Sequence, residues 1–345
     1  MALIFYTDPH IGVNRTGNTT RASREKLKES INNTVGKILG RRQEGDYLIC
    51  LGDLFDTYSN SESVIRQGST IVEMTDLILA GNHDVVADAD KVGSLELIMG
   101  HHPSKVIYAP FNEPHCDVRT FDGVAVVAVP HVTTQDLFEE SLSIAIEKAE
   151  LMTGMQRMLC LHCNYDSPHE LTETSLNLTP ERVQQLLGSF NYVLLGHEHQ
   201  PRDLFGGRLI ILGNTHPTGF SDISPKRIAI LDDKVLHFEE VWSEHEGYGE
   251  FYSDDLPALH ATLNQFVRIK GSVSSDQMAG VSKAISTLWK TSPNLLAMKS
   301  EVTVSDVPQQ EADQGEMTAE TLPALIEREL ESDPAMQSMW KEFTT

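Results

Sequence analysis

Short apolar runs alternate along the first 250 residues with stretches in which apolar residues recur every three or four positions. The runs predict strands, and the periodic stretches predict helices around residues 23–40, 61–73 and 134–151. Pro180 stands where the first turn of a further short helix would begin. The last runs, including a hairpin at 227–241, follow one another without helices. Alternating strands and helices followed by a run of strands predict a layered α/β sandwich with a mixed sheet.

The pattern changes after about residue 252. A strand-like run at 265–273, a helical stretch at 275–290 and a second run at 295–306 predict a compact βαβ-like unit. A segment of linker composition follows, and then a tail with apolar residues at helical spacing. Because that tail is too short to form its own core, we expect a helix that docks on a partner. The predicted organisation is a main domain at 1–250, a small α+β cap at 251–306, a linker at 307–318 and a C-terminal helix at 319–345.

Composition limits the class of protein. Of the 345 residues, 40% are hydrophobic, which is enough for a substantial core. Apolar runs stay short of the roughly 20 residues that a membrane-spanning helix needs. The N-terminus lacks the basic region and the cleavage site of a signal peptide, and four cysteines are too few for a disulfide framework. We expect a soluble cytoplasmic protein that does not bind a membrane.

The net charge of −23 argues against a free-standing nucleic-acid binder, because contacts to phosphate need local cations. The charge is unevenly distributed, however. Residues 1–45 carry a net charge of +4 and residues 307–345 a net charge of −7, whereas the cap is balanced. The basic stretch at the N-terminus is either a solvated helix face or a patch that faces a substrate.

Polar side chains of the kinds that bind metals follow five of the predicted strands. The first pair is Asp8 and His10, which lie two residues apart and therefore face the same side of an extended chain. The others are Asp53, the run Asn82–His83–Asp84, His162, and the pair His197 and His199. The glycines before Asp53, Asn82 and His197 permit tight turns and close approach of the backbone. The carboxyl ends of strands are where open α/β sheets place their active sites.

Seven of these side chains are candidate metal ligands, namely Asp8, His10, Asp53, Asn82, His162, His197 and His199. Seven donors are too many for one ion and suit two, with Asp53 as the carboxylate that bridges them. Oxygen and imidazole ligands without a thiolate fit manganese, iron, zinc or magnesium. The alternative of a zinc thiolate site at Cys160-x-x-Cys163 lacks the second cysteine pair that would complete it.

Two ions about 3.5–4 Å apart serve in-line displacement at phosphorus. His83 is not needed as a ligand, and it is the candidate general acid that protonates the leaving alkoxide. Asp84 is a candidate catalytic residue that orients His83, with a turn-capping role as its equal alternative. Asp56 either supports a ligand or is a turn residue.

The ordered series DPH, GDLFD, GNHD, LH and GHEH resembles the motifs of the calcineurin-like metallophosphoesterases. The stretches "TDPHIG", "GDLFDTYS", "LAGNHD" and "LGNTHPTGFSD" are most similar to the SbcD branch, the nuclease subunits of SbcC–SbcD complexes and counterparts of the nuclease in eukaryotic MRN. At 345 residues the chain is similar to bacteriophage exonuclease subunits of this branch. The resemblance implies a four-layer α/β/β/α sandwich with a small cap that faces DNA.

The resemblance also implies roles for individual residues. One ion would be held by Asp8, His10, Asp53 and His199, and the other by Asp53, Asn82, His162 and His197, with His83 as the catalytic histidine. The implied cofactors are two Mn²⁺ ions, with Mg²⁺ as the alternative. Candidate DNA contacts are Arg15, Arg21, Arg24, Arg268 and Lys270. Asp56 departs from the family pattern, since many cellular members have a histidine there.

The implied activity is exonuclease action on DNA duplex ends and endonuclease action on single strands, in replication, recombination or repair. The implied partner is an SbcC-like coiled-coil ATPase bound by the C-terminal helix, with a dimer of this chain inside a heterotetramer. The 345 residues contain no G-x-x-x-x-G-K-[ST] loop, so we expect no ATP site in this chain. Two alternatives are a metallophosphatase or small-nucleotide phosphodiesterase, and a non-catalytic scaffold for the ATPase or DNA.

Overall fold

Two six-stranded mixed sheets form the main part of the computed structural model, which describes residues 1–13, 21–86, 88, 90–167, 176–243 and 247–305. In the first sheet the N-terminal strand is central: β1 to β4 run parallel, and β13 pairs antiparallel with β1. The order is β14 (Val235–Trp242), β13 (Lys226–Asp232), β1 (Ala2–Tyr6), β2 (Tyr47–Cys50), β3 (Leu77–Leu79) and β4 (Val106–Ile107).

The second sheet has a parallel centre with an antiparallel strand at each edge. Strands β6, β7, β10 and β12 are parallel, whereas β5 and β11 pair antiparallel with their neighbours. The order is β11 (Arg202–Leu204), β12 (Leu209–Ile211), β10 (Tyr192–Gly196), β7 (Gln156–His162), β6 (Val124–Val129) and β5 (Asp117–Phe121). The predicted 227–241 hairpin is confirmed as β13 and β14 of the first sheet.

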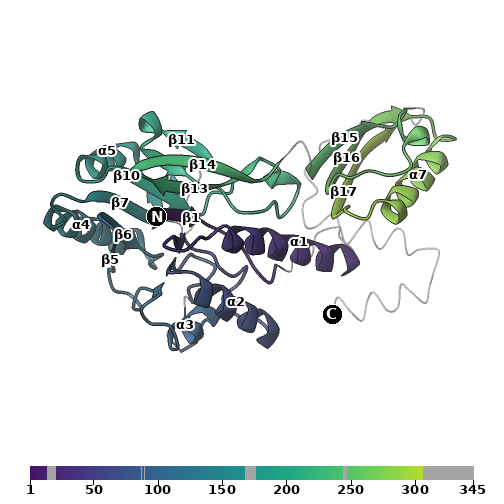
Figure 1. The fold of residues 1–345 in the computed structure, drawn as a ribbon. Helices are drawn as coiled ribbons and strands as arrows, with labels where there is room; N and C mark the ends of the chain where they lie inside the picture. Colours follow the sequence, from purple (N-terminus) through teal and green to yellow (C-terminus); the bar gives the residue numbers. More distant parts are fainter. Residues whose placement is uncertain (14–20, 87, 89, 168–175, 244–246, 306–345) are drawn as a thin grey trace, which may run out of the picture. The chain divides into compact units, whose positions relative to one another are not determined.

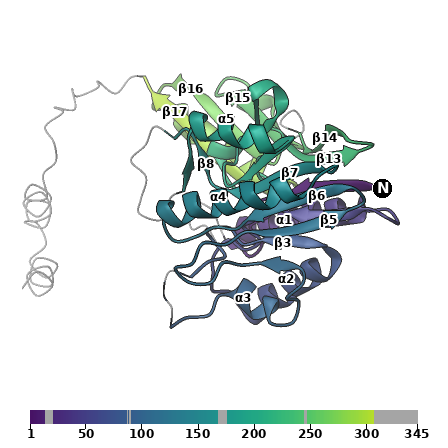
Figure 2. The ribbon, with the colours of Figure 1, turned by 90° about the vertical axis from the view of Figure 1, so that its left-hand side faces the viewer.

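Helices cover the outer faces of both sheets (Figures 1 and 2). Apolar side chains of α1 (Arg21–Gly40), α2 (Glu62–Met74) and α3 (Ser94–Met99) pack with the first sheet in one cluster. Those of α4 (Gln135–Leu151) and α5 (Pro180–Ser189) pack with the second sheet in another. A third cluster, which includes Phe5 and Met158, joins the inner faces of the two sheets. The predicted α/β/β/α sandwich is therefore confirmed.

The predicted helices begin and end close to the expected residues. The N-caps of α4 and α5 explain two of the starts, because the hydroxyls of Thr134 and Thr179 accept hydrogen bonds from the backbone N–H groups of Leu137 and Arg182. Pro180 occupies the first turn of α5, as expected. Helix α3, with only six residues, was not predicted.

The predicted βαβ-like elements are β16 (Phe266–Val273), α7 (Met278–Thr291) and β17 (Ala297–Val304), and the two strands belong to a third sheet. It also contains β15 (Tyr248–Tyr252), which was not predicted and pairs parallel with β16. Strand β15 begins before residue 251, and the cap boundary stays a prediction. Smaller elements are β8 (Asn164–Tyr165), β9 (Asn177–Leu178), η1 (Phe205–Gly207), η2 (Phe220–Asp222) and η3 (Leu256–Ala258).

The chain divides into two compact units, one of residues 1–271 and 280–302 and one of residues 272–279 and 303–345. The predicted linker and C-terminal helix, at 307–345, lie outside the described residues. Within the ranges that the structure describes, no helix is both long enough and apolar enough to cross a bilayer.

Candidate metal centre

The loops that follow β1 and β2 are bound to each other along the edge of the first sheet. The backbone N–H of Asp8 donates to the carbonyl of Gly52 at 3.0 Å, and that of His10 donates to the carbonyl of Asp53 at 3.1 Å. The pairing of the parallel strands thus extends beyond their ends. It places Asp8, His10 and Asp53 at one edge, as their positions after the strands predicted.

Four of the predicted ligands have a left-handed backbone, which side chains other than glycine rarely adopt. The φ angles are 51° at Asp8, 45° at His10, 49° at Asp53 and 87° at His197. Such strain is found mainly where surrounding structure enforces it, often at functional sites.

The glycines before the ligands leave room for the ligand side chains. A Cβ atom at position 52 would collide with the ring of His162, and one at position 81 would collide with the carboxylate of Asp53. A Cβ at position 196 would collide with the hydroxyl of Thr7. The expected close approach of the backbone is confirmed at all three glycines.

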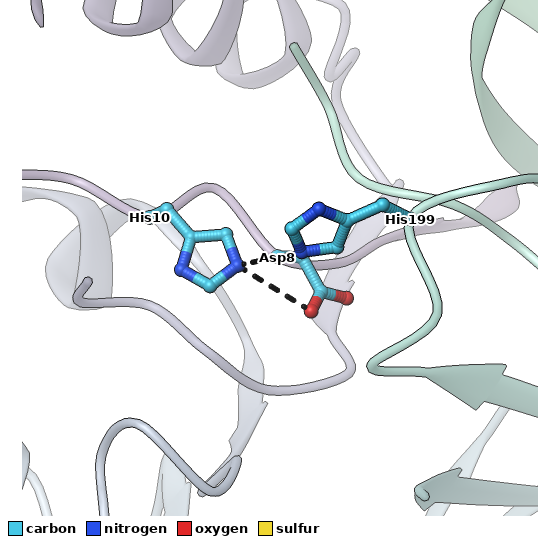
Figure 3. Close-up of side chains that lie close together, drawn as sticks. All are labelled: Asp8, His10 and His199. Atoms are coloured by element: carbon cyan, nitrogen blue, oxygen red, sulfur yellow. Dashed lines mark hydrogen bonds and ion pairs between the residues drawn. The ribbon is translucent and has the colours of Figure 1, made fainter. Parts of the chain in front are cut away.

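Three groups of described side chains are close enough to hold an ion, and two of them correspond to the predicted ligand sets. Asp8, His10 and His199 form the first of these two (Figure 3), whereas the remaining group is His10, Asp56 and His83. Nε2 of His10 lies 3.1 Å from Nε2 of His199 and 3.8 Å from Oδ1 of Asp8. Figure 3 shows the His10 ring directed toward both the Asp8 carboxylate and the His199 ring. Residues 8 and 10 follow β1 of the first sheet, whereas residue 199 follows β10 of the second, so both sheets contribute to this group.

Asp53, His162 and His197 form the second group, which Asn82 joins. Oδ1 of Asn82 lies 3.0 Å from Nε2 of His162 and 2.9 Å from Nδ1 of His197. Nδ1 of His162 donates to the carbonyl of Leu51 at 2.8 Å, which leaves Nε2 of that ring for a ligand.

Asp53 lies between the two groups. Its Oδ2 is 3.8 Å from Nε2 of His10 in the first group and 3.3 Å from Nε2 of His162 in the second. Its Oδ1 accepts a hydrogen bond from the backbone N–H of His83 at 2.9 Å. This position is the one that a bridging carboxylate requires.

The donor set fits two divalent cations. Asp8, His10, Asp53 and His162 are each only 1% exposed, and the described residues offer no hydrogen bond to Oδ1 of Asp8. A buried carboxylate oxygen without a donor is costly unless a cation neutralises it. The cysteines of the CxxC sequence are buried in the apolar clusters, so the ligands are oxygen and nitrogen atoms.

Opposed charges shift the pKa values within the ligand groups. Burial would lower the pKa of His162, but the carboxylates of Asp53 and Asp8 outweigh burial and raise it to about 10. Burial would raise the pKa of Asp53, but the imidazoles of His162, His10 and His83 hold it well below its ordinary value. Cations that bind here therefore compete with protons on the imidazoles.

His83 lies beside the ligand groups, with its ring held from one side. Nδ1 of His83 donates to the carbonyl of Asp56 at 2.6 Å. The Asp56 carboxylate lies 3.6 Å from Nδ1 of His10, which favours the alternative in which Asp56 supports a ligand over that of a turn residue. Nε2 of His83 is then the nitrogen that can exchange a proton with a substrate.

Asp84 accepts hydrogen bonds from three backbone N–H groups, those of Gly81 at 3.0 Å, Leu54 at 3.2 Å and Phe55 at 3.1 Å. Burial and the nearby Asp53 carboxylate raise the pKa of Asp84 to about 7. These contacts tie the loop after β3 to the loop after β2. They favour the turn-capping alternative over a direct catalytic role.

Within the described part of the chain, no interaction joins the candidate DNA-binding residues into one patch. Arg15 and the side chain of Arg21 lie outside the described part, and Arg24 lies on α1. Arg268 is 3.8 Å from Glu301, and Lys270 is 2.8 Å from Glu250. Directly after α1, Arg41 and Arg42 pair with Glu239 and Asp76, so part of the basic stretch is used within the protein.

Sequence reasoning missed three buried polar residues next to the ligand groups. His131 follows β6 and is 6% exposed, and burial and the neighbouring histidines lower its pKa to about 3. Its position after "VAVVAVP" repeats the strand-end pattern and was a usable signal. Asp222 and Lys226 lie against His199. Asp222 ends the stretch "LGNTHPTGFSD" that carries part of the resemblance, but the sequence assigned no role to either residue.

Comparison with known proteins identifies a family that this chain matches. The model of the family described as calcineurin-like phosphoesterase matches residues 1–201, which is more than half of the chain. The matched range contains all seven candidate ligands. The search among curated proteins found no match.

Several solved structures are similar to this chain at low sequence identity. A candidate 5'-nucleotidase from Staphylococcus aureus is 14% identical, with a TM-score of 0.45 over 69% of this chain and 52% of that chain. The calcineurin-like phosphoesterase YfkN from Bacillus subtilis is 11% identical, with a TM-score of 0.40 over 70% and 90%. The purple acid phosphatase PPD1 from yellow lupin is 12% identical, with a TM-score of 0.43 over 70% and 51%. This chain spans about half the length of the staphylococcal and lupin proteins.

Proposed function

Because the chain belongs to the calcineurin-like phosphoesterase family, we propose that it is a dinuclear-metal phosphoester hydrolase that cleaves DNA. We propose exonuclease action on duplex ends and endonuclease action on single strands. We further propose that the chain is the nuclease subunit of an SbcC–SbcD-like complex and works with a coiled-coil ATPase in the cytoplasm of its host.

The observation that carries the hydrolase part is the pair of ligand groups that share Asp53, with His83 beside them. Asp8, His10 and His199 would hold one ion, and Asn82, His162 and His197 the other. Bound divalent ions, Mn²⁺ or Mg²⁺, supply charge neutralisation at the phosphoryl oxygens and a hydroxide nucleophile at neutral pH.

The residues of this chain then orient the proton donor and protonate the leaving group. The Asp56 carbonyl fixes Nδ1 of His83, so Nε2 is the atom that delivers a proton to the leaving oxygen of the phosphodiester. Asp84 holds the His83 loop against the Asp53 loop through backbone hydrogen bonds. Together with the bond from the His83 backbone N–H to Oδ1 of Asp53, these contacts fix the position of His83 relative to Asp53.

The choice of DNA as substrate is supported by the resemblance of "TDPHIG", "GDLFDTYS" and "LGNTHPTGFSD" to the SbcD branch. The excess of positive charge in residues 1–45 agrees with it, although Arg41 and Arg42 already have acidic partners. The net charge of −23 supports a partner that supplies part of the DNA affinity.

The test is cleavage of end-labelled duplex and single-stranded DNA with Mn²⁺ or Mg²⁺, with and without the ATPase partner and ATP. We expect metal-dependent shortening of the duplex from its ends and internal cuts in the single strand. Turnover of a phosphopeptide or a cyclic nucleotide without DNA cleavage would establish the metallophosphatase or small-nucleotide alternative. If the metal-loaded wild-type protein cleaves no DNA even with its ATPase partner, and His83→Ala leaves binding unchanged, the scaffold alternative would be favoured.

A further inference from the structure

Lys226, the first residue of β13, is a fully buried lysine that the proposed chemistry does not use. Its ammonium donates to Oδ1 of Asp222 at 2.5 Å, to the backbone carbonyl of His199 at 2.9 Å and to Oγ of Ser224 at 3.2 Å. These three acceptors match the three donors of an ammonium group. Buried lysines are rare, and they are retained only where partners compensate the lost hydration.

Asp222 receives donors on both carboxylate oxygens. Its Oδ2 accepts from the side-chain amide of Asn214 at 2.6 Å, and from the backbone N–H and hydroxyl of Thr218 at 3.1 and 3.3 Å. The same oxygen lies 3.3 Å from Nδ1 of His199. Asp222 is 4% exposed, so the carboxylate is fixed from several directions in a largely dry environment.

His199 is therefore held twice by the same pair of residues. Lys226 binds its backbone carbonyl, and Asp222 faces its Nδ1. An imidazole whose Nδ1–H donates to a carboxylate keeps its lone pair on Nε2. Nε2 of His199 is the atom that faces His10 Nε2 at 3.1 Å in the first ligand group.

We propose that Asp222 and Lys226 are positioning residues that orient His199 as an Nε2 ligand and thereby set the affinity of the first ligand group for its cation. The proposal rests on the proposed metal centre, but it does not depend on DNA as the substrate. An ion pair that served folding alone would not need to contact both the backbone and the ring of one ligand. Buried ion pairs also tend to contribute little net stability, which favours a positioning role.

The test compares Asp222→Asn with the control Asp203→Asn. Asp203 forms an exposed ion pair with Arg227, the neighbour of Lys226, so the control removes a carboxylate from the same region without touching His199. Mn²⁺ is titrated into metal-free protein, and free Mn²⁺ is followed by electron paramagnetic resonance. We expect the control to bind two ions like the wild-type protein.

For Asp222→Asn we expect one of the two Mn²⁺ affinities to fall by about 10- to 100-fold, which is the usual effect of losing a carboxylate behind a histidine ligand. The other affinity should remain within about threefold. Equal losses in both affinities, or no loss in either, would overturn the proposal. Lys226→Met, which keeps the bulk of the side chain, should weaken the same single ion.

A second measurement uses the wild-type protein and so does not depend on the folding of a variant. Burial would lower the pKa of His199, but the carboxylates of Asp222 and Asp8 outweigh burial and raise it, so the metal-free protein is studied at a pH at which the ring is neutral. The ¹⁵N shifts of neutral His199, assigned with His199→Gln, should show a proton on Nδ1 and a lone pair on Nε2. The opposite tautomer would overturn the proposal. The two proposals can fail separately. If the wild-type protein binds two Mn²⁺ ions and Asp222→Asn weakens one of them, but the wild-type protein cleaves no DNA, the positioning role is supported and the nuclease function is refuted.

Discussion

At the scale of single residues, the ligands combine backbone strain with burial of charge. Asp8, His10, Asp53 and His197 have positive φ angles, each at a cost of about 1–3 kcal/mol. Of these, Asp8, His10 and Asp53 are also almost completely buried. Neither property favours folding, so both are tolerated only because the sheets on either side enforce them. Substitutions at these positions should therefore affect cation binding more than they reduce stability.

Asp53→Asn should abolish binding of both cations, because Asp53 is the carboxylate within reach of both ligand groups. The amide keeps the shape but loses the negative charge that attracts the ions. Bound Mn²⁺ per chain, measured after desalting, should fall from two to zero, whereas Asp203→Asn should retain two. Retention of even one tightly bound ion would show that Asp53 does not bridge the groups.

His83→Ala should reduce DNA cleavage by about 10²- to 10⁴-fold, the usual contribution of a general acid. Cation binding should be retained, because the hydrogen bond that His83 donates to Asp53 comes from its backbone N–H, which alanine keeps. The measurements are the initial rate on end-labelled DNA and Mn²⁺ stoichiometry, with His237→Ala on exposed β14 as the control. A His83→Ala protein that cleaves at the wild-type rate would exclude the assigned role.

The sequence could predict ligands that end apolar strands, because a parallel sheet brings the ends of distant strands to one edge. All seven were proposed on that ground, and the structure places them in two adjoining groups. It could not predict Asp222 and Lys226, since their importance depends on the turn at η2, which returns the chain to His199. For Asp84 the sequence left two alternatives, orientation of His83 and capping of a turn. Only the three backbone N–H donors seen in the structure favour the turn-capping role.

At the scale of elements, the turn between β3 and the His83 loop depends on the absence of a side chain at Gly81. Gly81→Ala should destabilise the protein by about 1–3 kcal/mol and weaken cation binding, because the new methyl group would displace the Asp53 carboxylate. Gly36→Ala on α1 is the matched control: nothing lies within 4 Å of a Cβ there, and alanine should stabilise the helix by about 0.5–1 kcal/mol. Urea unfolding measures the free energy of unfolding of both variants. Equal changes in that free energy for Gly81→Ala and Gly36→Ala would contradict the prediction.

Long periodic elements were predicted well, and short ones were not. Helix α1 has 20 residues and keeps one apolar stripe from Leu27 to Ile38, so its pattern is clear in the sequence. Helix α3 has six residues, too few for a repeat to be recognised. Strand β15, "YGEFY", carries a glycine and a glutamate and is half-buried, so it lacks the apolar run that identified the other strands.

The three-stranded sheet allows a test of the proposed DNA contacts. Lys270→Gln removes a cation whose ion pair with Glu250 is exposed, so stability should change by less than about 1 kcal/mol. If Lys270 contacts a phosphate, the affinity for DNA should fall and the slope of log K against log salt should decrease by about one. Arg66→Gln on α2 removes a similar exposed ion pair, and it should leave the affinity for DNA and the salt slope unchanged. An unaltered salt slope for Lys270→Gln would remove it from the DNA interface.

At the scale of the whole molecule, each sheet supplies part of the metal centre. The loops after β1, β2 and β3 supply Asp8, His10, Asp53 and Asn82. The last residue of β7 is His162, and the loop after β10 supplies His197 and His199. Neither sheet can form the centre alone. Cations that bind only the assembled sandwich therefore favour it over the unfolded chain by mass action.

The uneven charge of the whole chain leads to the last prediction. Residues 307–345 carry a net charge of −7 and apolar residues at helical spacing, a combination that suits docking on a partner better than contact with DNA. Deletion of 319–345 should abolish co-elution with the coiled-coil ATPase, while Mn²⁺ stoichiometry and cleavage of single-stranded DNA by the isolated chain remain. Size-exclusion chromatography of the mixture and a nuclease assay measure the two effects. A truncated chain that still co-elutes would place the ATPase contact elsewhere, and one that loses Mn²⁺ would show that the segment supports the sandwich.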